Sequence, residues 1–144
     1  CAGGIADGRG MAAAFALGAK GVQLGTRFVC SQECTVHEAY KQTIAEAKER
    51  CTAVTGQSTG HPVRCIANKL TKKFLELEKA CASAEEIEKV GIGRLRAAVV
   101  DGDMEMGSVM AGQSAALVSD VRPCADIIRD MVAEAEKVIS SIAS

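Results

Sequence analysis

The sequence predicts an α/β fold that is mostly helical and contains a small parallel sheet. Two short apolar segments, 1–5 and 21–25, have the pattern of buried strands, and the Ala-rich segment 11–17 between them favours a helix. Strand, helix and strand in this order form a parallel βαβ unit. The rest of the chain provides no further strands for a parallel sheet, and two strands do not form one by themselves. We therefore expect the chain to be the C-terminal part of a larger α/β protein.

Composition excludes several classes of protein. The chain has 144 residues, of which 48% are apolar and 24% charged, and its formal net charge is −1. This balance argues against a disordered chain and against binding to nucleic acid or to an anionic membrane. No apolar run approaches the roughly 20 residues that span a bilayer. The seven cysteines are scattered through apolar and helical stretches, which is typical of a reducing, cytoplasmic location.

A metal site is not expected. Cys30 and Cys34 form the only close cysteine pair, and His37 and His61 do not complete a zinc-binding spacing with them. We expect these cysteines to be small buried hydrophobic residues.

Local signals divide the remaining chain mainly into helices. Asp7 is placed to cap the first helix and Gly18 to end it, and Ser83 is placed to cap a later one. The last helix has apolar residues at a period of about 3.6, so one face packs on a core. We expect a short strand at 51–55, a turn at 59–64, and helices at 36–48, 67–79, 84–90, 95–100, 107–118 and 125–142.

Two glycine-containing turns directly follow the expected strands. They are Gly3-Gly4 and Gly25-Thr26, one helix apart in the sequence. The carboxyl ends of adjacent parallel strands lie at one edge of a sheet, and in (β/α)8 barrels the loops after the last two strands often hold a phosphate. Glycine lets several backbone N–H groups approach an anion. The pair therefore favours a phosphate site over two plain turns.

The chain resembles a known family over nearly its whole length. Segments 2–10 and 21–28 are similar to the last two barrel strands of the nitronate monooxygenase (2-nitropropane dioxygenase-like) superfamily of FMN-dependent TIM barrels. The longer set of motifs is most similar to the flavin-dependent enoyl-acyl-carrier-protein reductases of bacterial fatty-acid synthesis. These further motifs are 58–64, Asn68, 102–107 and 110–117, the last beginning Met-Ala-Gly-Gln.

The resemblance implies a domain layout and a set of binding residues. Residues 1–34 would form the last two strands of a (β/α)8 barrel, 35–105 a small helical cap over the substrate, and 106–144 the returning barrel helices. His61 would border the substrate cleft, with a structural role as the alternative, and a solvent-facing position is the alternative for Gln113. The residues implied to bind FMN are Gly3, Gly4, Gln23, Gly25, Thr26 and Gln113.

The resemblance also implies a reaction. The intact enzyme would pass hydride from NAD(P)H through FMN to an enoyl thioester carried on acyl carrier protein or coenzyme A, with activation by a monovalent cation. The proposed catalytic histidine belongs to earlier barrel strands, so no catalytic residue is expected in this segment. The alternatives are a nitronate monooxygenase and an inactive fragment that only folds or self-associates.

Two surface features concern partners. Lys69, Lys72 and Lys73 share one helix face, which suits an acidic carrier protein or is a plain solvated face. Exposed edges on the two expected strands favour association, so we expect a homo-oligomer.

Overall fold

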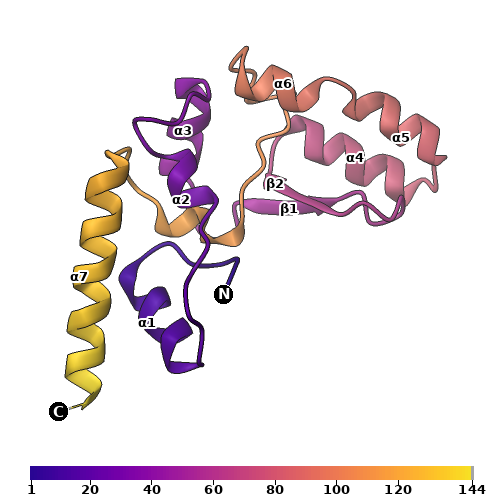
Figure 1. Ribbon diagram of the computed structural model, residues 1–144. Helices are drawn as coiled ribbons and strands as arrows, with labels where there is room; N and C mark the ends of the chain where they lie inside the picture. Colours follow the sequence, from indigo (N-terminus) through magenta and orange to yellow (C-terminus); the bar gives the residue numbers. More distant parts are fainter. Residues whose placement is uncertain (144) are drawn as a thin grey trace.

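The computed structural model describes residues 1–143, which are arranged in two lobes (Figure 1). Helix α7 lies beside α1 at one side of the molecule, and the small sheet with α4 and α5 lies at the other. The first lobe contains α1 (Gly8–Ala16), α2 (Thr26–Val29), α3 (Glu38–Ala45), the 3₁₀ helix η1 (Gln113–Leu117) and α7 (Cys124–Ala143). The second contains β1 (Thr52–Thr55), β2 (Val63–Ile66), α4 (Lys69–Lys79), α5 (Ala84–Gly91) and α6 (Arg94–Val99).

The βαβ unit expected at the start of the chain is present only in outline. Ala2 and Gln23 form a parallel bridge, in which the Gln23 amide donates to the Cys1 carbonyl at 2.8 Å. Within residues 1–143 the bridge is isolated, and neither segment 1–5 nor segment 21–25 is a regular strand. The two segments are therefore parallel neighbours, although they lack the further strands that would extend their pairing.

The caps of the first helix are as predicted. The Asp7 side chain accepts a hydrogen bond from the Gly10 amide at 2.9 Å, and Gly18 has a left-handed φ of 92° just after the helix. Burial opposes ionisation of Asp7, but the Gly10 amide and the Arg9 guanidinium outweigh it, so the pKa of this carboxyl is lowered.

Helix α1 packs closely on α7. A Cβ atom at Gly8 would lie 2.5 Å from the Met131 carbonyl oxygen, so only glycine fits this contact. The Gly8 amide also donates to the Glu134 carboxylate at 2.7 Å. A small core between the two helices includes Ile5, Ala14, Ile127 and Met131.

The second lobe contains an antiparallel sheet, of which only one strand was expected. β1 confirms the strand expected at 51–55. It pairs with β2 so that Thr52 lies opposite Ile66 and Thr55 opposite Val63. The sequence predicts only a turn at 59–64, because Gly60 and Pro62 dominate that window. The turn is real but ends at residue 62, and four residues of strand follow it.

The helix expected at 107–118 is wrong. Residues 108–112 are extended along β2, with the Ile66 amide donating to the Val109 carbonyl at 2.8 Å and the Ala111 amide to the Arg64 carbonyl at 3.2 Å. Within the expected range 107–118 the only helix is the short η1. The sequence predicts returning barrel helices at 106–144, and in the described part of that range α7 is the one α-helix. Gly107 and Gly112 lower helix propensity here, and β2 satisfies the extended backbone.

The main core joins the two lobes. Ile44 of α3, Val109 of the extended segment and Val118 after η1 are fully buried in it. By contrast, α1 and α7 leave several large apolar side chains exposed, namely Leu17, Ile128, Val132, Ile139 and Ile142. None of the helices in the described part of the chain has the length and apolarity to cross a membrane.

Candidate cofactor and substrate site

The glycine loops lie side by side. Because Ala2 bridges Gln23 in parallel, Gly3-Gly4 and Gly25-Thr26 both follow the bridge in the same direction, at one edge of the pair. We call these four residues the glycine rim. The arrangement is the one that the order of the two turns in the sequence predicts.

The glycine rim fits an anionic group. Gly3 and Gly4 have left-handed φ values of 87° and 76°, and nothing lies within 4 Å of a Cβ atom added at either residue. Within residues 1–143, the amides of Gly4, Gly25 and Thr26 donate no hydrogen bond. Unpaired backbone N–H groups in an open glycine loop are common protein ligands of a phosphate. The chemistry of the rim therefore agrees with a bound phosphate ester.

Residues from the far end of the chain complete the rim. The Thr26 hydroxyl oxygen accepts a hydrogen bond from the Gly112 amide at 3.0 Å, which places the start of η1 beside the rim. Gln113, the first residue of η1, is exposed, and so is Gln23 beside Ala2. Four of the six residues expected to bind FMN thus form the rim, and Gln23 lies beside it. The sixth, Gln113, follows the residue that bonds to Thr26.

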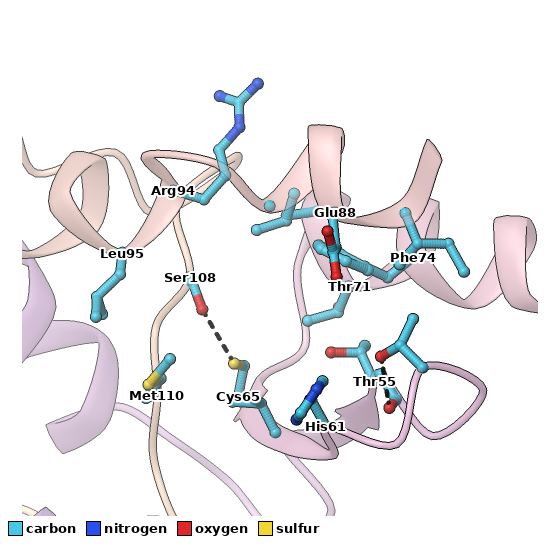
Figure 2. A pocket seen from close by; sticks show the side chains of 16 residues that line it. Thr55, His61, Cys65, Thr71, Phe74, Glu88, Arg94, Leu95, Ser108 and Met110 are labelled. Atoms are coloured by element: carbon cyan, nitrogen blue, oxygen red, sulfur yellow. Dashed lines mark hydrogen bonds between the residues drawn. The ribbon is translucent and has the colours of Figure 1, made fainter. Parts of the chain in front are cut away.

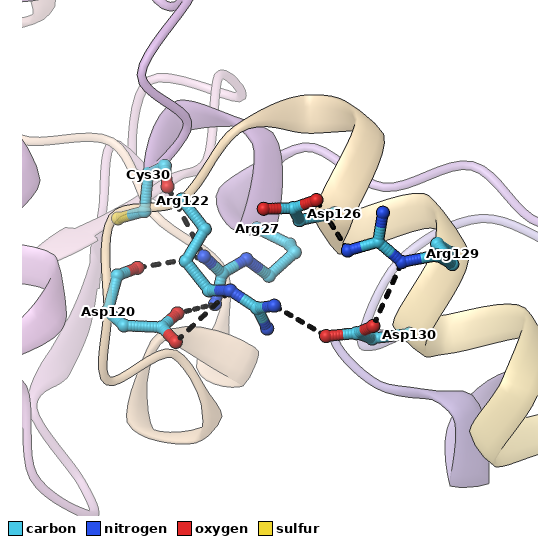
Figure 3. A network of polar contacts seen from close by, with 7 residues as sticks. All are labelled: Arg27, Cys30, Asp120, Arg122, Asp126, Arg129 and Asp130. Atoms are coloured by element: carbon cyan, nitrogen blue, oxygen red, sulfur yellow. Dashed lines mark hydrogen bonds and ion pairs between the residues drawn. The ribbon is translucent and has the colours of Figure 1, made fainter.

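A buried arginine anchors the rim from behind, and it is the residue that sequence reasoning missed. Arg27 is only 7% exposed and donates to the Asp120 carboxylate at 2.8 Å and to the Asp120 carbonyl at 2.8 Å (Figure 3). It also donates to the Cys30 carbonyl at 3.2 Å. Its Nε atom is buried without a partner in the described part of the chain. The signal in the sequence was a charged residue in the mainly apolar stretch after Gly25-Thr26.

The same corner contains a second arginine cluster. Arg122 donates to the Asp130 carboxylate, which holds the pKa of that carboxyl below its ordinary value, and Arg129 contacts Asp126 and Asp130 (Figure 3). Arg129 and Asp130 are exposed and Arg122 and Asp126 are half-buried, so these ion pairs contribute little to stability. Arg122, which pairs with both Asp120 and Asp130, connects the first turns of α7 to the segment that carries Asp120.

The second lobe encloses a cavity of about 220 Å³, which we call the cap cavity (Figure 2). It lies between the sheet, α4, α5, the start of α6 and the extended segment 108–110. His61 lies in its wall, in the turn between β1 and β2. The apolar part of the wall consists of Val63, Leu70, Phe74, Ile87, Leu95 and Met110.

Cys65 lines the cap cavity, but its thiol is not a strong nucleophile. Its thiol is within 3.3 Å of the Ser108 hydroxyl, and burial raises the pKa of Cys65 above its ordinary value. The thiol therefore stays neutral at ordinary pH and packs as a small apolar group. The residues that the structure describes also contain no group of three or more His, Cys, Asp or Glu side chains that could hold a metal ion.

The extended segment connects the cap cavity to the glycine rim. Ser108 and Met110 line the cavity, and Gly112 bonds to Thr26 two residues later. Tyr40 holds this segment by donating its hydroxyl hydrogen to the Met110 carbonyl at 2.8 Å. Burial raises the pKa of Tyr40 to about 12.

The lysine cluster is only partly free. Lys69, Lys72 and Lys73 are exposed on α4, and Lys69 forms an ion pair with Glu105. Asn68, which caps the same helix, donates its side-chain amide to the Met104 and Gly107 carbonyls at 2.9 Å each. These contacts fasten the loop before the extended segment to the start of α4.

Comparison with known proteins places the chain in a family. A family model described as nitronate monooxygenase matches residues 1–134. A probable nitronate monooxygenase of Staphylococcus saprophyticus is 34% identical over 139 residues, covering 96% of this chain and 39% of that protein. An indene-carboxyl-CoA dehydrogenase of Mycobacterium tuberculosis is 29% identical over 171 residues, covering 93% of this chain and 48% of that protein.

A solved structure is more similar still. FabK from Thermotoga maritima is 48% identical with a TM-score of 0.94, and the match covers 99% of this chain and 45% of that one. The chain thus spans less than half the length of these relatives. The family expected from the resemblance of segments 2–10 and 21–28 is confirmed: the chain belongs to the nitronate monooxygenase family.

Proposed function

We propose that this chain is the phosphate-binding and cap portion of an FMN-dependent enoyl-acyl-carrier-protein reductase. The observation that carries the proposal is the glycine rim, where two parallel segments end in open glycine loops with unpaired amides. In this interpretation segments 1–5 and 21–25 are the carboxyl ends of the last two barrel strands.

The rim residues would hold the FMN phosphate. The amides of Gly4, Gly25 and Thr26 would donate to the phosphate oxygens, and Gly3 gives the loop its left-handed turn. Gln23 pairs with Ala2 beside the rim, and Gln113 directly follows Gly112, which bonds to Thr26. FMN would supply hydride transfer from NAD(P)H to the β-carbon of an enoyl thioester. The second lobe would exclude water from the substrate.

The relatives support an enoyl reductase over a nitronate monooxygenase. Identity is 48% to FabK, an FMN-dependent enoyl-acyl-carrier-protein reductase, and 34% to the probable nitronate monooxygenase. The coenzyme A thioester in the name of the mycobacterial relative also supports a thioester substrate. Nitronate oxidation remains the second candidate, because the matching family model and several curated relatives carry that name.

A chimera tests the proposal. This chain replaces the matching part of Thermotoga maritima FabK, with which it shares 48% of its residues. Two assays are run on the chimera: oxidation of NADH or NADPH with crotonyl-CoA, and oxygen uptake with propyl-2-nitronate. Unmodified FabK is the control for the first assay. We expect thioester-dependent oxidation of the nicotinamide.

The outcomes separate the candidates. Oxygen uptake with the nitronate but no thioester reduction supports the monooxygenase and overturns the reductase. A folded chimera that retains no FMN contradicts the assignment of the rim. Adding K⁺ or NH₄⁺ to the active chimera tests the predicted activation by a monovalent cation, and the two nicotinamides test cofactor preference.

Two partner proposals complete the function. The exposed apolar side chains of α1 and α7 support self-association of this chain, so light scattering is expected to show a dimer or larger species. The exposed Lys72 and Lys73 support docking of an acidic carrier protein. Replacing both with Glu in the chimera is expected to raise KM for acyl-carrier-protein substrates while leaving KM for coenzyme A thioesters unchanged.

A further inference from the structure

We propose that the cap cavity binds the aliphatic acyl chain of the thioester substrate. The proposal rests on the reductase function and adds to it the residues that accommodate the chain. It concerns the second lobe and does not involve the unpaired amides of the glycine rim.

The wall of the cap cavity is suited to hydrocarbon. Six large apolar side chains from β2, α4, α5, α6 and the extended segment line it. Three hydroxyl groups in the wall bond within the protein: the Thr59 hydroxyl to the Gly56 carbonyl at 3.1 Å, the Thr71 hydroxyl to the Asn68 carbonyl at 2.9 Å, and the Ser108 hydroxyl to the Cys65 thiol. These groups gain nothing from a polar ligand, whereas apolar area buried here is removed from water.

Charged groups lie towards the outside of the cap cavity. Glu88 is exposed, and Arg94 is half-buried with its Nε donating to the Val90 carbonyl at 3.3 Å (Figure 2). A ligand with a polar head and a long apolar tail matches this division between the charged outside and the apolar interior of the cap cavity. A free sugar, nucleotide or other polar ligand does not.

The volume sets the length of the chain. An apolar cavity of about 150 Å³ holds benzene, which is about 25 Å³ for each carbon. At that density the 220 Å³ of the cap cavity accommodates an acyl tail of about eight or nine carbons.

One short segment joins the cap cavity to the glycine rim. Met110 lines the cap cavity, and Gly112, two residues on, bonds to Thr26 of the glycine rim. Two residues of extended chain span at most about 7 Å. A tail in the cavity therefore leaves its carbonyl end near the segment that borders the rim.

The test measures binding of saturated acyl N-acetylcysteamine thioesters, with tails of four, six, eight, ten and twelve carbons, to the 144-residue chain. Saturated thioesters do not react, and the assay needs no flavin, so it can succeed or fail independently of the proposed function. Methyl NMR spectra are expected to change at Val63, Leu70, Ile87, Leu95 and Met110. Each added methylene is expected to tighten Kd about fourfold until the tail reaches about eight carbons.

Two contrasting outcomes would overturn the proposal. In one, Kd does not depend on tail length below eight carbons. In the other, the methyl changes fall on Val132, Ile139 and Ile142, the exposed apolar face of α7, instead of on the cavity wall. Methyl changes at the cavity wall, together with a Kd that falls as the tail lengthens, support the proposal.

A matched pair of variants locates the tail. Leu95 lines the cap cavity and is 43% exposed, so Leu95→Trp fills the cavity with little disturbance of the fold. It is expected to weaken binding of the octanoyl thioester at least tenfold and that of the butanoyl thioester less than threefold. Val100→Trp is the control, because Val100 is exposed just after α6 and does not line the cavity.

Val63→Phe gives the same test from β2, should Leu95→Trp lose its circular dichroism spectrum. Wild-type octanoyl affinity in whichever filling variant folds would overturn the assignment. A tenfold loss in Val100→Trp would do the same, because it would show that bulk anywhere in the lobe has this effect.

Discussion

Replacing Arg27 with methionine removes the guanidinium that anchors the Gly25-Thr26 loop while keeping a side chain of similar length. Three hydrogen bonds disappear, two to Asp120 and one to the Cys30 carbonyl. The loop then depends on the short helix α2 and on the bond from Gly112 to Thr26.

The expected cost is about 2 kcal/mol of unfolding free energy. Hydrogen bonds to a charged group contribute about 1.5–3 kcal/mol each when buried. Three considerations reduce the sum: the Asp120 side chain is 48% exposed and returns to water, the Cys30 carbonyl keeps a 3.4 Å bond from the Arg122 amide, and the unpaired Nε atom is removed. Methionine also retains most of the packing of the arginine stem.

Urea unfolding followed by far-ultraviolet circular dichroism measures this change, with Arg129→Met as the matched control. Arg129 also pairs with aspartates, but its side chain is 67% exposed, so its loss is expected to cost less than about 0.5 kcal/mol. The urea midpoint of Arg27→Met is expected to fall with an unchanged m value. Equal midpoints for the two variants would refute the anchoring role of Arg27.

Two further predictions concern packing and ionisation. Gly8→Ala is expected to destabilise the chain by about 2–3 kcal/mol, because the added Cβ meets the Met131 carbonyl; Gly21→Ala, whose Cβ meets nothing within 4 Å, is expected to cost less than about 0.5 kcal/mol, and equal urea midpoints would contradict the α1–α7 contact. Tyr40 is the only tyrosine and there is no tryptophan, so ultraviolet absorbance follows its ionisation directly, with an expected midpoint of about pH 12. Since its pKa is raised on folding, its contribution to stability is complete below about pH 10 and is lost as pH rises towards 12; a midpoint near pH 10 in the folded chain would contradict its burial.

Elements set by neighbouring residues could be predicted from the sequence. The caps at Asp7 and Ser83 and the long periodic helix α7 depend on contacts within a few residues. Strand β2 and the extended segment 108–112 could not, because their backbone groups bond to each other across more than forty positions of sequence, as in the bond from Ile66 to Val109. The residues between Gly107 and Gly112 form no local sequence pattern that distinguishes an extended segment from a helix.

The same distinction applies to the site. The glycine rim could be predicted because each loop shows its own turn residues, and the parallel βαβ order places the two loops together. The role of Arg27 could not, because its partner Asp120 is 93 positions away. The cap cavity likewise depends on how α4, α5 and the sheet pack, which no short motif reports.

Amide NMR of the chain titrated with FMN and, separately, with riboflavin tests the phosphate assignment of the glycine rim most directly. The two ligands differ only by the phosphate group, and weak binding is sufficient for the measurement. The account predicts shifts at the Gly4, Gly25 and Thr26 amides with FMN and none there with riboflavin. Equal responses to both ligands, or an FMN response confined to residues away from these amides, would contradict it.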